Sequence, residues 1–260
     1  MQKRRCCDRP ALLVVLCCCA AQAFVAPAPQ RRATLTGGER RPPSRMSEEP
    51  APLLLRAARG EKVERTPVWM MRQAGRHMAA YRALVSKYPT FRERSEIPEV
   101  SLEVSLQPWR AYGVDGVILF SDILTPLPAM GVDFAISEAG GIQIEPIRTR
   151  EAFRRMTDAG PFDPAGKVPF VGEVLRKLRA EVAASGATVL GFVGLPFTLG
   201  TYLVEGATGT TNNFANIREL RQSDPELVRD MLSLLARNIA QYAAYQIESG
   251  AQVMNRRSHL

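Results

Sequence analysis

Two arginines stand four residues apart in residues 66–78, which read T-P-V-W-M-M-R-Q-A-G-R-H-M. If this segment is helical, the spacing of Arg72 and Arg76 puts both side chains on one face; if it is a loop, Gly75 lets a ligand approach the backbone. A guanidinium is always charged, and its fork of donors fits a carboxylate or a phosphate at two points. The segment is therefore a candidate anion-binding site. A pair of surface arginines in salt bridges is the competing interpretation.

A carboxylate is the second candidate for chemistry. Residues 113–120, G-V-D-G-V-I-L-F, form a short apolar run that predicts a buried parallel strand. Ser121 and Asp122 follow directly. In a barrel of alternating strands and helices the chemistry lies at the C-terminal ends of the strands, which is the position of Asp122. Capping of the next turn is the alternative role for this side chain.

The elements that would position these side chains alternate along the chain. Four main helices are predicted. The first is short, beginning at Pro52 and ending at Gly60, and apolar residues at helical spacing predict two more at 171–182 and 227–242. The apolar alternation at 98–112 would suit a strand, but a proline at the start and Pro108 inside favour a kinked helix. A capping-box pattern at residues 223–226 precedes the last helix. A second buried strand is predicted at 187–193, and a third begins at 251–254.

Residues 128–164 are interpreted mainly as loop, with a short helix near 151–156. The order of strands and helices on either side predicts an α/β fold, a parallel sheet covered by helices, which is either doubly wound or a (β/α)8 barrel. No G-x-G-x-x-G sequence follows either clear strand, so dinucleotide binding has no support.

The first 46 residues have the composition of a targeting leader. Four basic residues precede an apolar run of about ten residues, too short to span a bilayer, and an A-Q-A sequence that ends at Ala23. This is the layout of a signal peptide over residues 1–23. Residues 24–46 are rich in arginine and small residues, as in transit peptides. The pair resembles the bipartite leaders of proteins sent to plastids with extra membranes, so we expect plastid delivery and one domain over 47–260.

Most of the net charge belongs to this leader. Of the formal charge of +8, residues 1–46 carry +7, so the high isoelectric point gives no support for nucleic-acid binding. All five cysteines also lie there, and residues 47–260 hold only His77 and His259. These residues therefore exclude disulfides and thiolate metal sites and argue against a histidine metal site. They also contain no apolar run long enough for a membrane span.

Five segments in series carry a resemblance to a known family. They are P-V-W-M-M-R-Q-A-G-R (67–76), Y-P-T-F-R-E-R-S-E (88–96), L-Q-P-W (106–109), G-V-I-L-F-S-D-I-L-T-P-L (116–127) and G-F-V-G-L-P-F-T-L-G-T-Y-L-V-E-G (191–206). Together they resemble uroporphyrinogen decarboxylase over about residues 50–254. The resemblance implies a TIM barrel that converts uroporphyrinogen III to coproporphyrinogen III in porphyrin, haem and chlorophyll biosynthesis. It also implies that the four acetate arms lose carbon dioxide without a metal or an organic cofactor.

The resemblance implies roles for five positions. Arg72 and Arg76 match arginines that hold the eight carboxylates of the substrate, and Ala74 contributes backbone of the same loop. Asp122 matches an aspartate that accepts hydrogen bonds from the pyrrole N–H groups and stabilises a protonated ring. Tyr202 matches a tyrosine near the substrate, with a packing role beneath the loop as the alternative. The expected catalytic residues are Asp122 and Arg72, since one of the two arginines is a candidate proton donor.

The chain departs from the family pattern after Met254. The family continues with five further strands and with loops that carry a serine and a histidine, and neither Ser258 nor His259 matches those loops. We therefore expect only the N-terminal part of the barrel, truncated after about residue 254, with an exposed sheet edge. The full-length protein is expected to be a homodimer.

Two alternative functions remain at this point. One is an inactive fragment that binds tetrapyrroles. The other is a cobalamin-linked methyltransferase of the same superfamily, which would need a zinc site with cysteine and histidine ligands.

Overall fold

The computed structural model describes residues 51–71, 73–136, 141–208 and 213–257, together with the backbone of residues 15–17 and 21–25. Arg72, Ser258, His259 and most of residues 1–46 lie outside this set. The expectations stated for them therefore stay expectations.

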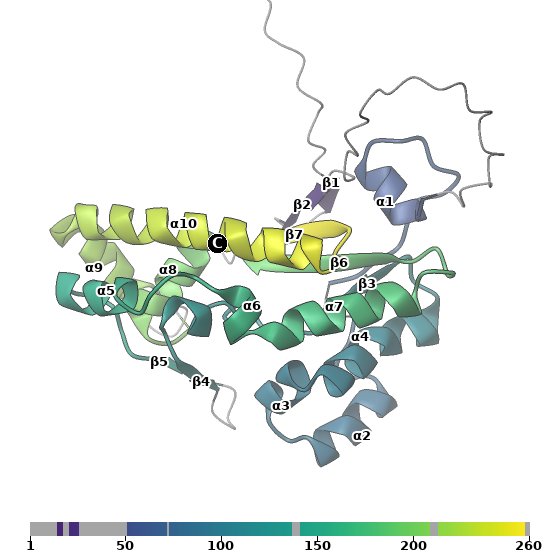
Figure 1. Ribbon diagram of the computed structural model, residues 1–260, viewed down its shortest axis with the longest axis horizontal. Coiled ribbons are helices and arrows are strands. Elements are labelled where there is room, and N and C mark those ends of the chain that lie inside the picture. Colours follow the sequence, from purple (N-terminus) through teal and green to yellow (C-terminus); the bar gives the residue numbers. More distant parts are fainter. Residues whose placement is uncertain are drawn as a thin grey trace, which may run out of the picture.

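A five-stranded sheet in the order β1-β2-β7-β6-β3 forms the centre of the molecule (Figure 1). Its parallel strands are β3 (Gly116–Ile118), β6 (Thr188–Gly194) and β7 (Val253–Arg257). They pair in chain order, with Gly116 opposite Thr188 and Leu190 opposite Val253. Pairing of consecutive parallel strands is the arrangement found in a (β/α)8 barrel.

The outer edge of β7 differs from the expectation. We expected an exposed edge here, but β2 (Ala21–Val25) pairs with β7 in antiparallel orientation, and β1 (Val15–Cys17) pairs with β2. In the full chain the backbone groups of β7 on this side thus have hydrogen-bond partners. Both covering strands belong to residues 1–46, so the described part of residues 47–260 by itself leaves this edge of β7 without a partner strand, as expected.

Helices flank the sheet, and α4, α7 and α10 each precede one of the parallel strands (Figure 1). Adjacent members of this trio contact one another, and α10 also lies against β6. The helices of the described chain have these bounds: α1 (Leu53–Ala58), α2 (Ala79–Lys87), α3 (Phe91–Glu96), α4 (Pro98–Tyr112), α5 (Arg150–Thr157), α6 (Pro164–Lys167), α7 (Pro169–Glu181), α8 (Pro196–Glu205), α9 (Ala215–Ser223), α10 (Pro225–Glu248) and the 3₁₀ helix η1 (Pro128–Met130).

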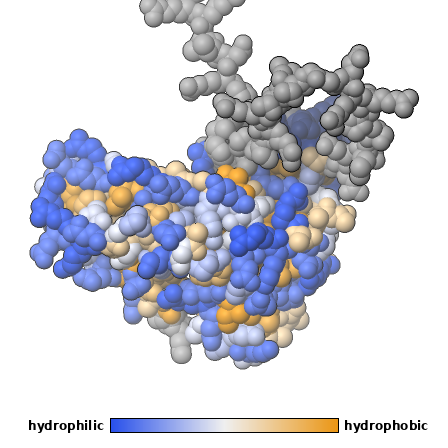
Figure 2. Space-filling view, in the orientation of Figure 1, coloured by the Kyte–Doolittle hydropathy of each residue, from blue (hydrophilic) through white to orange (hydrophobic). Residues whose placement is uncertain are grey.

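The core lies between these helices and the sheet. Leu175 and Leu178 of α7, Val189 of β6 and Leu235 of α10 are fully buried. The opposite sides of α7 and α10 carry charged residues, and the face drawn in Figure 2 is largely hydrophilic over them. One apolar side on each helix is what attaches it to the sheet.

One buried polar contact ties α10 to β6. The amide of Gln246, which is fully buried, donates to the carbonyl of Phe192 at 2.9 Å and accepts from its N–H at 3.0 Å. Gly191 permits this approach, because a Cβ atom there would lie 2.5 Å from the Gln246 Oε1 atom. The contact fixes the backbone of Phe192, a residue that lines the pocket described below.

The main helix predictions are confirmed. The predicted helix at 98–112 is α4, which tolerates Pro108 and ends at Gly113 in a left-handed conformation with φ of 62°. The helices expected at 171–182 and 227–242 are α7 and α10. The start of α10 is corrected, since its N-cap is Asp224, whose side chain accepts from the N–H of Leu227 at 3.0 Å.

The interpretation of 128–164 as mainly loop is wrong in one part. Strands β4 (Phe134–Ile136) and β5 (Ile142–Ile144) form an antiparallel pair there. Each has three residues, which is too short to show a period-2 alternation of apolar and polar residues. The short helix expected near 151–156 is α5. Among the described helices, none is long and apolar enough to cross a membrane.

Candidate active site

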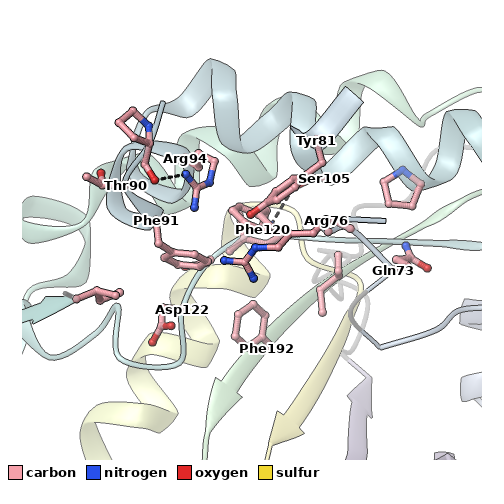
Figure 3. Close-up of a pocket in the computed structure, with 18 of the residues that line it drawn as sticks. Gln73, Arg76, Tyr81, Thr90, Phe91, Arg94, Ser105, Phe120, Asp122 and Phe192 are labelled. Atoms are coloured by element: carbon pink, nitrogen blue, oxygen red, sulfur yellow. Dashed lines mark hydrogen bonds between the residues drawn. The ribbon is translucent and has the colours of Figure 1, made fainter. Parts of the chain in front are cut away.

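A pocket of about 790 Å³ lies at the C-terminal ends of β3 and β6 (Figure 3). Its described walls come from the loop before α2, from α2, α3, α4 and the turn between α2 and α3, from β3 and the chain that follows it, from β6, and from the hairpin of β4 and β5. This is the end of the strands where TIM barrels place their chemistry.

The structure brings three of the expected site residues into this pocket. Ala74, Arg76 and Asp122 all line it, and Arg76 is exposed to solvent. Figure 3 shows the long side chain of Arg76 reaching past Phe120 toward Phe91 and Phe192. The cationic side chain of Arg76 and the anionic side chain of Asp122, which come from different loops, thus line the same pocket.

The turn after β3 holds Asp122 in place. Its Oδ1 atom accepts from the N–H of Leu124 at 2.8 Å, and its own N–H donates to the Thr125 hydroxyl at 3.2 Å. The hydroxyls of Ser121 and Thr125 are 2.8 Å apart. The turn-capping role weighed for Asp122 is therefore present, and it orients the carboxylate that lines the pocket.

Two serines of α4 hold the chain between β3 and Asp122. The hydroxyl of Ser101 donates to the Phe120 carbonyl at 2.8 Å, and the Phe120 N–H donates to the Ser105 hydroxyl at 2.8 Å. Ser105 in turn donates to the Ser101 carbonyl at 2.7 Å. Both backbone groups of Phe120 are satisfied by side chains, as buried backbone requires.

The loop that contains Arg76 is connected to the start of β3 by hydrogen bonds. Asp115 accepts from the two terminal nitrogens of Arg65 at 2.5 and 2.7 Å and from the N–H of Val68 at 2.7 Å. Gln73, which is buried, donates to the Gly116 carbonyl at 3.0 Å. Its Oε1 atom accepts from the N–H of Met70 at 3.3 Å. These contacts fix both ends of the stretch that contains position 72.

Tyr202 lies on α8 and is half-buried. Burial raises its pKa, and the negative charge of Asp122 raises it further. Tyr202 is not among the described residues that line the pocket. The structure therefore links Tyr202 to Asp122 through the effect of charge on its pKa.

Aromatic side chains that sequence reasoning did not select form much of the wall. Tyr81, Phe91, Phe120 and Phe192 all line the pocket. The ring of Phe120 lies 6.0 Å from that of Tyr81 and 5.3 Å from that of Phe91, measured between centroids. The ring planes meet at 64° and 41°, so these aromatic side chains give the pocket an angled apolar wall. Phe120 and Phe192 could have been found from the sequence, because each lies at or near the C-terminal end of a predicted strand.

The described residues offer no metal site. No group of three or more His, Cys, Asp or Glu side chains among them could hold a metal ion.

Comparison with known proteins identifies the lineage. Residues 49–256 match the family model of uroporphyrinogen decarboxylase (URO-D). The chain belongs to this family. It is 57% identical over 204 residues to the uroporphyrinogen decarboxylase of Picosynechococcus sp., a match that covers 78% of this chain and 57% of that protein. The match to the enzyme of Nostoc punctiforme is 55% identical over 204 residues, covering 78% of this chain and 56% of the relative.

The chain thus spans just over half the length of these uroporphyrinogen decarboxylases. Its three parallel strands and their helices form the N-terminal part of the TIM barrel of the URO-D family. A methyltransferase from Methanosarcina mazei has a similar structure, with a TM-score of 0.55 and 18% identity, over 78% of this chain and 57% of that one. This likeness shows the fold alone.

We predict that Asp115→Asn destabilises the protein in a pH-dependent manner. Arg65 holds the pKa of Asp115 below its usual range through their hydrogen bond. Since this pKa is lower in the folded than in the unfolded chain, the stabilisation is present above about pH 4 and is lost as the pH falls through the folded-state pKa. Urea unfolding at pH 7 should show a loss of about 1–3 kcal/mol in the free energy of unfolding, and the loss should shrink toward pH 3.

Asp133→Asn is the matched control, because Asp133 is exposed. It should leave the free energy of unfolding nearly unchanged at both pH values. An equal effect of Asp115→Asn at pH 7 and pH 3 would contradict the assignment of its stabilisation to the charged form.

Proposed function

We propose that this protein decarboxylates the four acetate arms of uroporphyrinogen III to give coproporphyrinogen III, without a cofactor, in porphyrin biosynthesis. One observation carries this proposal: Arg76 and Asp122 line a single aromatic-walled pocket at the C-terminal ends of barrel strands. A substrate with carboxylates on its rim and N–H donors at its centre needs a cation and an anion arranged in this way.

The chemistry follows from where charge develops. Protonation of a pyrrole ring beside an acetate arm makes the ring an electron sink. The bond between the methylene and the carboxylate then breaks, carbon dioxide leaves and the bonding electrons pass into the ring. A proton added to the methylene carbon completes the methyl group, and loss of the proton first added to the ring restores the neutral pyrrole. Asp122, held by the N–H of Leu124, would stabilise the positive ring by a fixed opposite charge.

The other residues would serve binding and proton supply. Arg76 and Arg72 would hold substrate carboxylates, with Arg72 also the proposed proton donor. The backbone at Ala74 would contact substrate in the same loop. Tyr202, whose pKa already responds to the charge of Asp122, would contribute near the substrate from α8.

Anaerobic incubation of the chain with uroporphyrinogen III, followed by chromatography of the oxidised products, tests this function. We predict porphyrins with successively fewer carboxylates, ending at four. Asp122→Asn should lower the rate about a hundredfold or more, because it removes charge stabilisation that acts in the transition state. Asp133→Asn, on an exposed residue outside the pocket lining, should have little effect.

Full activity of Asp122→Asn would contradict the role of this carboxylate. Binding of the porphyrinogen with no release of carbon dioxide would instead assign the chain to the alternative of a non-catalytic tetrapyrrole-binding protein.

We further propose that residues 1–46 deliver the protein to a plastid, where its product would serve haem and chlorophyll synthesis. The cyanobacterial source of the relatives named above supports this location. A fluorescent protein fused to residues 1–46 should enter the plastid of an alga with extra plastid membranes. A fusion that carries only residues 24–46 should remain in the cytosol, and plastid entry of that fusion would contradict a signal peptide at 1–23.

The resemblance also supports a homodimer for the full-length protein. Sedimentation velocity of the full-length protein should show a species of twice its monomer mass, and a monomer at tens of micromolar would contradict the proposal.

A further inference from the structure

Arg94 of α3 is a buried arginine that lines the pocket. Only 4% of its surface is exposed, although its neighbours in the sequence R-E-R-S-E are typical of a solvent-exposed helix. Its guanidinium lies 5.7 Å from the centre of the Tyr81 ring, another part of the pocket wall. Figure 3 shows Arg94 on the wall beside Thr90, while Arg76 enters from a different element.

The guanidinium of Arg94 forms no salt bridge with an acidic side chain among the described residues. Its Nη1 atom donates to the carbonyls of Tyr88 and Pro89 at 2.5 and 2.6 Å, and its Nε atom is buried with no hydrogen-bond partner. The carboxylate of the adjacent Glu93 accepts from the N–H and the hydroxyl of Thr90, and these bonds, with a smaller contribution from the charge of Arg94, lower its pKa. Glu93 is thus near Arg94 but makes its hydrogen bonds to Thr90. Carbonyl oxygens carry only partial charge, so most of the arginine charge remains uncompensated.

Arg92, two residues away, shows the ordinary alternative. It is exposed, and it forms a two-point ion pair with Glu96 at 2.6 and 3.2 Å. The contrast matters because a buried charge without a counter-ion is costly. A structural capping role for Arg94 explains the bonds from Nη1 but not the placement of an unpaired cation in a pocket wall.

We propose that Arg94 supplies a further positive charge for binding a carboxylate arm of the substrate, at the wall formed by residues 89–94. This inference rests on the proposed function and extends it, since it adds an anchor on α3 to the arginines of the loop before α2. A bound carboxylate provides the counter-ion that the described protein residues do not.

The test is fluorescence titration of the whole chain with uroporphyrin III, the oxidised and stable form of the eight-carboxylate ligand. Arg94→Gln should weaken binding about tenfold or more, because hydrogen bonds to charged groups contribute strongly. It should also flatten the dependence of the affinity on salt concentration, since one ionic contact is lost. Arg94→Lys, which keeps the charge, should bind within about threefold of the unmodified chain.

Arg92→Gln is the matched control on the same helix, and its affinity and salt dependence should be unchanged. A structural role alone would lower the thermal stability of Arg94→Gln and leave the salt dependence as it was. If Arg94→Gln binds uroporphyrin like Arg92→Gln, the proposal for Arg94 is overturned while the proposed function stands. If the unmodified chain binds no uroporphyrin, both are overturned.

A second measurement covers the case in which Arg94→Gln does not fold. The chain is labelled with ¹⁵N-arginine, and the Nε–H resonance of Arg94 is identified by its absence in Arg94→Lys. Saturation with uroporphyrin III should shift this resonance and leave that of Arg92 in place. An unshifted Arg94 resonance at saturation would overturn the proposal.

Discussion

The site depends on the hydrogen bonds that hold the backbone of Phe120. Strand β3 pairs with β6 over only three residues and ends at Ile118, so the chain beyond it needs other partners for its buried polar groups. Ser101 and Ser105 of α4 provide them. Asp122 follows two residues later, and its position in the pocket is set by a helix that packs behind the strand.

The same short strand also carries the cationic loop. Asp115 and Gly116, at the start of β3, hold Val68 and Gln73. The loop with Arg76 is thus fixed at one end of the strand, and the turn with Asp122 is fixed at the other. Strand β3 and helix α4 together therefore hold the backbone on both sides of the pocket, and such fixed backbone favours preorganised charges.

Much of this arrangement could be predicted from the sequence. The long amphipathic helices and the two buried strands have strong periodic signals, and Asp122 was recognisable by its place after a strand. The helices α2 and α3, of nine and six residues, were missed. Segments this short rarely show a clear apolar pattern, although two others, near 53–58 and 151–156, were recognised. Tyr81 of α2 and Phe91 of α3, which form part of the pocket wall, were therefore missed as well.

The burial of the charged side chain of Arg94 also could not be predicted from the sequence. Arg92 and Arg94 have the same residue type, yet one pairs with Glu96 at the surface and the other is enclosed. Only tertiary packing decides between these outcomes. The antiparallel pairing of β2 with β7 is likewise a long-range contact. No local pattern in residues 21–25 predicts it.

On the proposed function, one pocket holds the rim of a polyacidic tetrapyrrole with arginine and its centre with Asp122. The most direct measurement is a crystal structure of the chain grown without oxygen in the presence of coproporphyrinogen III. The account predicts pyrrole nitrogens within hydrogen-bond distance of the Asp122 carboxylate and a propionate arm at Arg76. A tetrapyrrole bound outside this pocket, or bound in it with its nitrogens turned away from Asp122, would contradict the account.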